Sequence, residues 1–348
     1  MNNINPLKPL ILALSIAPFF LLSCEKEIEF KGQETDPMLI LNGFLTPDSA
    51  VAVHLSKSRF IFDTNQTFSF IENANVELFV NGAPYETLRH AGGGSYRGTY
   101  MPKERDAIAV HASAGGFEPV KAETIIPAAP SIELADSTIA LEWLKLYDQY
   151  ESNPEEGFVS LIQTNNIKLR LKEPENEKNG YFIKVNKTFY NNDGYNFTQP
   201  EDVDVKSILK GNVSGGTGNI FDFIDEDEWD YSPVKNLFSD DLINGQDVFL
   251  DFKLVDNIKT IPVKDENIPD DNLVENEQEN TICLSSMSEE YYRFVISSTK
   301  AETSNDNPFS EPVQVTSNVE NGAGILGSYT TATYTYKFKI YRYNGVYF

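Results

Sequence analysis

The sequence predicts an all-β protein built from two β-sandwich domains. Short runs of alternating apolar and polar residues recur along the chain, and turn-forming residues interrupt them every eight to twelve residues. That spacing is typical of β-sandwiches, and helical periodicity is nearly absent. Hydrophobic residues make up 41% and aromatic residues 12% of the 348 residues. This composition supplies enough apolar surface for a core and excludes a wholly disordered chain.

The first predicted domain spans residues 37–129. Its strand candidates are five short segments, at residues 38–41, 50–55, 74–80, 95–100 and 107–112. Asn81-Gly82 directly follows the third segment, and Asn-Gly is a strong signal for a tight hairpin turn. Residues 124–127 close the domain, and the proline-bounded segment 127–130 is the predicted boundary.

The second predicted domain spans residues 130–348. Its strand candidates lie at residues 131–134, 166–171, 180–185, 247–254, 281–284 and 291–297. Two short helix candidates lie at residues 140–150 and around residues 286–291. Two polar insertions, at residues 191–218 and 264–280, are predicted to be loops, which often carry recognition.

The segment from Leu284 to Tyr292 resembles the tyrosine corner of fibronectin type III domains. In that corner, a tyrosine at the start of a strand donates a hydrogen bond back across the turn. We therefore predict that both domains are immunoglobulin/fibronectin-like sandwiches, the second with long loop insertions.

The first 23 residues have the pattern of a bacterial secretory signal. Lys8 precedes an apolar run at residues 9–22, which is short for a membrane span and has the length of a signal-peptide core. The run ends in a sequence that resembles the lipobox of bacterial lipoproteins, namely Leu21, Leu22, Ser23 and Cys24. We predict a signal peptide over residues 1–23, fatty acylation of Cys24, and a tether over residues 24–36. The alternative is an ordinary signal peptide that contains a cysteine by chance.

The net charge restricts the possible partners. The chain carries 52 acidic and 28 basic residues, a formal charge of -24, and nucleic-acid binding needs Lys and Arg to neutralise phosphates. Loss of Lys8 with the signal peptide changes the charge to -25, so an anionic membrane would not attract the mature protein. Membrane attachment is therefore expected to come from the lipid on Cys24. The acidic residues 25–29 also resemble signals that send lipoproteins to the cell surface in the Bacteroidota.

Several segments, in the same order, resemble a family of Bacteroidota outer-membrane lipoproteins known as domain of unknown function 4249. The segments are residues 39–48 (LILNGFLTPD), 74–78 (ANVEL), 94–96 (GSY), 238–241 (FSDD), 244–246 (NGQ), 307–313 (NPFSEPV) and 317–329 (SNVENGAGILGSY). The resemblance implies an outer-membrane lipoprotein, often encoded beside a TonB-dependent transporter, with no established activity and no catalytic residues. The glycine-rich residues 322–327 are predicted to form a tight backbone turn against a neighbouring strand, because the context of a phosphate-binding loop is missing.

The sequence contains few residues and no motifs that would form a metal site or a catalytic site. The calcium candidates are Asp225, Asp227 and Asp230, within one of two acidic segments, and the other segment spans residues 265–279. Neither has the spacing of an EF-hand, so solvated charge is the favoured interpretation and no cofactor is predicted. Three histidines and two cysteines leave no zinc or nucleophile motif, and no catalytic residue is predicted. His54 and His111 are expected to be surface or hydrogen-bonded strand residues.

Aromatic residues give the better functional candidates. The asparagine-rich segment 191–194 is bracketed by Phe189, Tyr190, Tyr195 and Phe197, which could stack on a sugar or contact a protein. The alternative is that alternate members face the core, as we expect for Tyr181. We therefore expect a non-enzymatic binding protein at the exterior face of the outer membrane, serving a TonB-dependent transporter in nutrient capture or uptake. Two alternatives stay open, namely a structural or adhesive surface lipoprotein without a transporter, and a hydrolase that uses paired carboxylates.

Overall fold

Long β-strands dominate the structure, as predicted for a mostly β protein. The computed structural model describes residues 36–59, 67, 69–146, 158–174, 177–190, 196–201, 203, 205–209, 235–241, 243–262, 273–305 and 313–343. The strands of this part form sheets of nine, five and three strands. The sequence signal of alternating residues therefore identified the fold class.

The first core lies between the five-stranded sheet and one half of the nine-stranded sheet. The nine-stranded sheet contributes β1 (Leu39–Leu45), β2 (Ala52–Lys57), β5 (Arg89–Gly92) and β6 (Ser95–Arg97). The five-stranded sheet contains β3 (Asn75–Val80), β4 (Ala83–Thr87), β7 (Ala107–Ser113), β8 (Val120–Ile125) and β16 (Val319–Glu320). Alternate residues of these strands point inward, and Leu41, Leu55, Val76 and Val110 are fully buried.

The predicted hairpin at Asn81-Gly82 is confirmed. Strands β3 and β4 pair antiparallel on either side of these two residues. Both residues have positive φ angles, 51° for Asn81 and 78° for Gly82, as a two-residue turn of this type requires.

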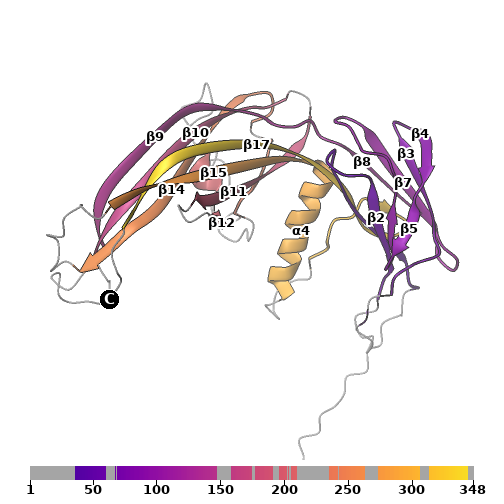
Figure 1. The fold of residues 1–348 in the computed structure, drawn as a ribbon. Helices are drawn as coiled ribbons and strands as arrows, with labels where there is room; N and C mark the ends of the chain where they lie inside the picture. The colour runs from indigo at the N-terminus through magenta and orange to yellow at the C-terminus, as the bar shows by residue number, and fades with distance from the viewer. Residues whose placement is uncertain are drawn as a thin grey trace, which may run out of the picture. The chain divides into compact units, whose positions relative to one another are not determined.

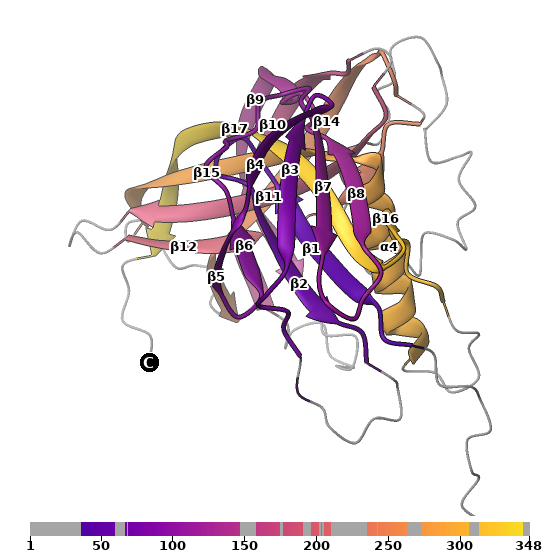
Figure 2. The ribbon, with the colours of Figure 1, turned by 90° about the vertical axis from the view of Figure 1, so that its right-hand side faces the viewer.

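The second core lies between the three-stranded sheet and the other half of the nine-stranded sheet (Figures 1 and 2). The three-stranded sheet has the order β14 (Asp247–Pro262), β10 (Phe158–Lys172), β9 (Ser131–Leu146). Facing it are β11 (Asn179–Tyr190), β12 (Asn196–Glu201), β13 (Leu237–Ser239), β15 (Leu273–Ser288) and β17 (Ala323–Tyr343). The short helix α2 (Val205–Ile208) packs on this core, in which Leu169, Ile183 and Leu250 are fully buried.

Strand β17 connects the two halves of the nine-stranded sheet. It pairs parallel with β1 near its start and antiparallel with β15 over its remaining length. Gly324 permits the parallel contact, since its φ is +109° and a Cβ atom there would lie 2.2 Å from the Leu41 carbonyl oxygen. The predicted close approach to a neighbouring strand is confirmed, but the prediction of a tight turn over residues 322–327 was wrong, because residues 323–327 lie in β17. The described residues from Pro37 onward belong to one compact unit.

The prediction of a strand over residues 291–297 was wrong, because these residues belong to helix α4 (Glu289–Asn305), visible in Figure 1. Glu289 and Glu290 occupy the first turn, where carboxylates stabilise a helix. Gly180 and Gly327 leave room for the helix, since a Cβ atom would lie 2.3 Å from Tyr292 and 2.7 Å from Tyr291, respectively. Both tyrosines lie in α4, so the tyrosine-corner interpretation also fails.

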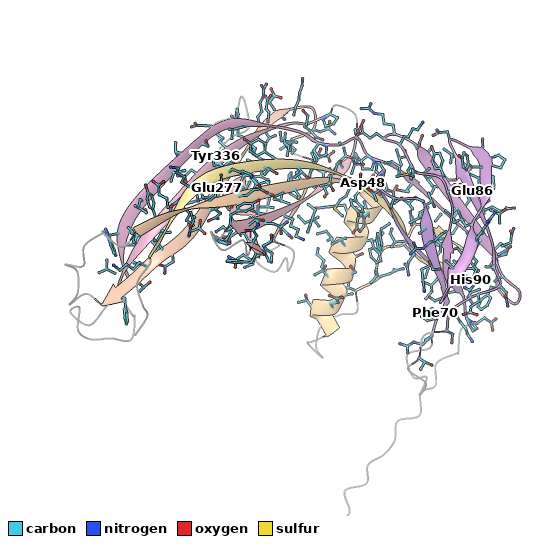
Figure 3. The ribbon with its side chains drawn as sticks, in the orientation of Figure 1. Asp48, Phe70, Glu86, His90, Glu277 and Tyr336 are labelled. Carbon is cyan, nitrogen blue, oxygen red and sulfur yellow. The ribbon has the colours of Figure 1, made fainter. Side chains whose placement is uncertain are left out.

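Three further local predictions were wrong. Residues 140–146, part of a helix candidate, lie in β9, which is hydrogen-bonded to β10 along its length. Residues 196–201 and 273–280, expected in loops, lie in strands β12 and β15, and Figure 3 shows Glu277 on β15. The polar composition of β15 does not mean that the strand is exposed. Two of its inward-facing residues, Gln278 and Asn280, are polar and fully buried.

None of the helices in the described ranges combines the length and the apolar composition that a transmembrane helix needs.

Candidate functional site

A layer of polar side chains crosses the interior of the second sandwich. On β10, β11 and β14, it separates the large apolar core from a smaller apolar cluster around Leu161, Phe189 and Ile258. Successive inward positions in a strand are two residues apart. The polar positions are Gln163 and Asn165 on β10, Lys187 on β11, Asp256 on β14, and Gln278 and Asn280 on β15, all buried.

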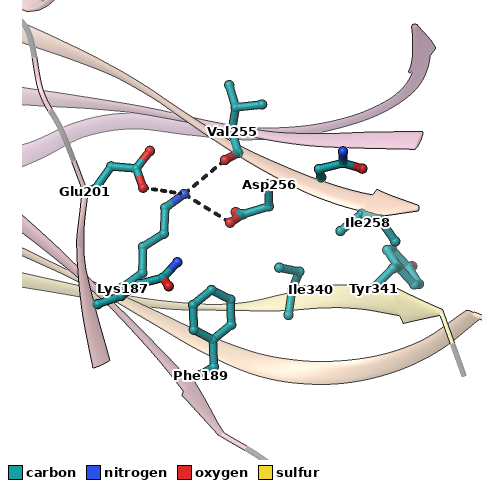
Figure 4. Close-up of a pocket in the computed structure, with 10 residues that line it drawn as sticks. Lys187, Phe189, Glu201, Val255, Asp256, Ile258, Ile340 and Tyr341 are labelled. Atoms are coloured by element: carbon teal, nitrogen blue, oxygen red, sulfur yellow. Dashed lines mark hydrogen bonds and ion pairs between the residues drawn. The ribbon is translucent and has the colours of Figure 1, made fainter. Parts of the chain in front are cut away.

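Lys187 is the central charge of this layer. Its side chain is 2% exposed, and its Nζ atom lies 3.0 Å from each of three acceptors (Figure 4). These acceptors are the Val255 carbonyl oxygen, Asp256 Oδ1 and Glu201 Oε2. Two of the three ammonium protons are donated in hydrogen bonds, to the Val255 carbonyl oxygen and Asp256 Oδ1, and Glu201 contributes an ion pair.

Asp256 connects Lys187 to the buried amides. Its second oxygen, Oδ2, accepts hydrogen bonds from Asn165 Nδ2 at 3.3 Å and from Gln278 Nε2 at 3.5 Å. Gln278 Nε2 also lies 3.3 Å from Asn280 Oδ1. The carboxylate is thus held by groups from both sheets, which fixes its position.

Two amide atoms of the layer make no hydrogen bond within the described part of the chain. They are Gln278 Oε1 and Asn280 Nδ2, both fully buried. A buried polar atom without a partner costs about 1–3 kcal/mol. The layer therefore carries a stability cost at these atoms, as is common at sites kept for function.

A pocket of about 520 Å³ opens beside Lys187 (Figure 4). Apolar residues from three strands line it, including Phe189, Ile258 and Ile340. Its other described lining residues are Lys187, Gln199, Glu201, Val255, Asp256, Asn257 and Tyr341. The Phe189 ring stacks on Phe197 of β12 with centroids 4.7 Å apart and planes at 17°. Half of the lining residues are polar or charged, so this pocket is more polar than the usual small-ligand site and offers several groups that could orient a ligand.

A second buried polar group lies at the other end of β11. The Tyr181 hydroxyl donates to Glu173 Oε2, and Glu173 Oε1 makes no hydrogen bond within the described residues. Burial first, and then the nearby carboxylates of Asp240 and Glu177, together raise the pKa of the Glu173 carboxyl to about 7. Burial also raises the pKa of Asp240. Glu173 is therefore a carboxyl group that holds its proton up to near-neutral pH.

Helix α4 and the sheet enclose a second, apolar pocket of about 430 Å³. Its described lining residues are Phe44, Phe182, Leu237, Ser285, Met287, Tyr291, Val295 and Tyr329. This lining offers few polar groups that could fix the orientation of a ligand. The pocket beside Lys187 is therefore the better candidate site.

The profile of one protein family, described as domain of unknown function (DUF4249), matches residues 25–335. The chain belongs to this family. The match extends from residue 25 into β17 and confirms the resemblance seen in the sequence. None of the curated proteins matches the chain.

In this DUF4249 chain, the predicted aromatic residues divide between two faces of β11. Phe189 and Phe197 come together at the pocket, where Phe189 is 7% exposed and Phe197 is 38% exposed. Tyr190 is on the opposite face, where its hydroxyl donates to Glu279 Oε2 at 3.1 Å. Tyr195 lies outside the described residues. Tyr181 is fully buried, as expected.

The sequence analysis did not identify the charged residues of the pocket. A local signal for one of them is present in β11, where Tyr181, Ile183, Val185, Lys187 and Phe189 occupy one face. A single lysine among apolar residues on a buried face must have a counter-charge. The identity of that counter-charge depends on pairing with β12 and β14, which are distant in the sequence.

The remaining predicted site residues are the lipidation and calcium candidates, which lie outside the described residues, and His54. Cys24 and the lipobox residues Leu21, Leu22 and Ser23 lie outside the described residues, as do Asp225, Asp227 and Asp230. Within the described ranges, no group of three or more His, Cys, Asp or Glu residues could hold a metal ion. His54 is a hydrogen-bonded strand residue, since its Nε2 atom lies 2.6 Å from the Gly93 carbonyl oxygen.

Proposed function

We propose that this protein is a non-enzymatic binding protein and that the pocket beside Lys187 is its ligand site. The observation that carries the proposal is the pocket itself, a space of about 520 Å³ whose charged residues are already fixed by contacts across two sheets. A site whose residues are held in place before the ligand arrives loses little conformational entropy on binding.

The state of Lys187 favours binding over catalysis. A lysine that acts as a nucleophile must reach the substrate with its nitrogen atom. Two carboxylates and a carbonyl oxygen of the protein already surround the Lys187 nitrogen at 3.0 Å. The lysine therefore serves to position Asp256 and Glu201 at the pocket.

The proposal includes an outer-membrane location and a transporter partner. Acylation at Cys24 would hold the protein on the outer membrane, facing the exterior, and residues 24–36 would act as the tether. The partner would be a TonB-dependent transporter. The protein would deliver a nutrient to this transporter or retain the nutrient there. The support for this step is the lipobox-like sequence at residues 21–24 together with what resemblance to the family implies.

We also propose that the two sandwich cores represent immunoglobulin/fibronectin-like units, at residues 37–129 and 130–348, with β16 and the start of β17 completing the first unit. The support is that each core lies between two facing sheets. Such units would act as rigid supports for the pocket and for recognition loops.

The decisive experiment is to purify the native protein through a C-terminal tag from detergent-solubilised outer membranes. Co-purification of a TonB-dependent transporter in a fixed ratio is the expected result. Recovery of the lipoprotein alone, even after mild cross-linking, would remove the transporter from the proposal and favour a free-standing structural or adhesive surface protein.

A further inference from the structure

The charges that line the pocket do not balance. The charged side chains among its described lining residues are Lys187, Asp256 and Glu201, one positive and two negative. The Glu201 side chain is 26% exposed, whereas that of Asp256 is 9% exposed. The excess negative charge is therefore most accessible at Glu201, on the open side of the pocket.

The hydrogen-bonding capacity left in the pocket is mainly that of acceptors. Lys187 donates two of its protons to the Val255 carbonyl oxygen and Asp256 Oδ1 and forms an ion pair with Glu201, so an anionic ligand would have to compete with two carboxylates for this ammonium group. Each carboxylate oxygen can accept more than one hydrogen bond. Within the described residues, Glu201 forms an ion pair through Oε2 with Lys187. The charged groups of the pocket therefore favour a ligand that donates hydrogen bonds, while the neutral Gln199 amide can donate or accept them.

The walls of the pocket suit the remainder of such a ligand. Phe189, Ile258 and Ile340 present apolar surface within the space of about 520 Å³, and Tyr341 adds an aromatic ring. Aromatic rings attract cations as well as apolar groups. The lining thus combines a partly exposed carboxylate with apolar and aromatic side chains that are themselves mostly buried.

From this arrangement we propose that the pocket binds a small organic cation, an ammonium or guanidinium group on an apolar chain. The inference rests on the proposed binding function and specifies its ligand class. Glu201 accepts hydrogen bonds from the cationic group, and the apolar chain lies along Phe189 and Ile340. Lys187 has a positioning role, because it holds both carboxylates in place.

Three probes of equal chain length test this inference by calorimetric titration of the detergent-purified full-length protein. The probes are 1,5-diaminopentane, 1,5-pentanediol and glutarate, which are cationic, neutral and anionic. The diamine is expected to bind at least about tenfold more tightly than the diol, the size of one good charge-assisted contact, and glutarate is expected not to bind. Added salt should weaken diamine binding, because it screens the carboxylate.

Substitutions on β12 assign the effect to the pocket. Glu201→Gln should weaken diamine binding about tenfold, and Gln199→Glu, at an exposed lining position, should strengthen it. Glu133→Gln is the matched control, because Glu133 is an exposed carboxylate on β9 that pairs with Arg170 outside the pocket. Thermal unfolding would verify that each variant is folded.

Two results would overturn the ligand class. If the diol or glutarate binds as tightly as the diamine and Phe189→Ala weakens that binding, the pocket is a ligand site for another class and the proposed function stands. If no probe binds, or if Glu201→Gln and Gln199→Glu leave diamine binding unchanged, the cation site is wrong. Co-purification with a transporter would still test the proposed function separately.

Discussion

Lys187 determines how the interior of the second sandwich is arranged. Burial of a charge is costly, and the attraction between paired buried charges often only balances that cost. The ion pairs of Lys187 with Asp256 and Glu201 are therefore weak evidence for added stability. Their clearer consequence is geometric, because one ammonium group joins β11, β12 and β14 at a single point.

Glu173 predicts a specific pH dependence of stability. Its pKa is raised to about 7 in the folded protein from an ordinary value of 4.5, so the native state keeps a proton that the unfolded chain has lost. The free energy of unfolding therefore falls as pH rises from 4.5 to about 7, by roughly 3 kcal/mol at most.

Glu173→Gln should remove this part of the pH dependence, since a glutamine stays neutral and can still accept the Tyr181 hydrogen bond. Urea unfolding at several pH values between 5 and 8 would measure it. Asp240 contributes in the same direction in both proteins, because burial raises its pKa as well. Parallel curves for the wild type and the variant would show that Glu173 ionises normally.

At the scale of elements, the parallel pairing of β1 with β17 depends on Gly324. Its φ of +109° is unfavourable for any residue with a Cβ atom, and that atom would lie 2.2 Å from the Leu41 carbonyl oxygen. Gly324→Ala should destabilise the protein by about 2 kcal/mol or more, through backbone strain and separation of the strands. Thermal or urea unfolding would measure the loss.

Gly115→Ala is the control for this substitution, because a Cβ atom at Gly115 would meet nothing within 4 Å. Its effect should remain within about 0.5 kcal/mol, as is usual at the surface. Equal stability losses for the two variants would mean that the close approach at Gly324 is not what restricts this position.

The local sequence pattern correctly predicted the strands that have one buried face and one more exposed face. Strands β1, β3 and β7 alternate between buried and more exposed residues, and the Asn81-Gly82 turn has a strong local signal. The prediction failed where the tertiary environment determined the outcome. In α4, aromatic and β-branched residues that favour a strand form a helix on a sheet whose glycines, Gly180 and Gly327, leave the necessary space.

The candidate site could be predicted only in part, for the same reason. Phe189 and Phe197 were recognised because aromatic residues beside a polar segment are a local feature. The carboxylates of Glu201 and Asp256 meet Lys187 through strand pairing and through contact between facing sheets. The spacing of residues along one strand predicts neither the paired strand nor the residues of the facing sheet.

At the scale of the whole molecule, the net charge restricts how the protein can attach to a membrane. A formal charge of -24 opposes electrostatic binding to an anionic surface. Several acyl chains on one residue are sufficient for firm anchoring, whereas one chain alone is marginal. Attachment should therefore depend on Cys24 and be insensitive to salt.

Cys24→Ala should abolish fatty acylation and release the protein from the outer-membrane fraction, while a high-salt wash should leave the wild type attached. Metabolic labelling with an alkyne-bearing palmitate analogue, followed by membrane fractionation, measures both effects. Cys283→Ala is the matched control, because it removes the half-buried cysteine of β15 and should keep the label. If Cys24→Ala retained the label, or if high salt released the wild-type protein, the lipid anchor would be refuted, and the tether and transporter proposals would lose their basis.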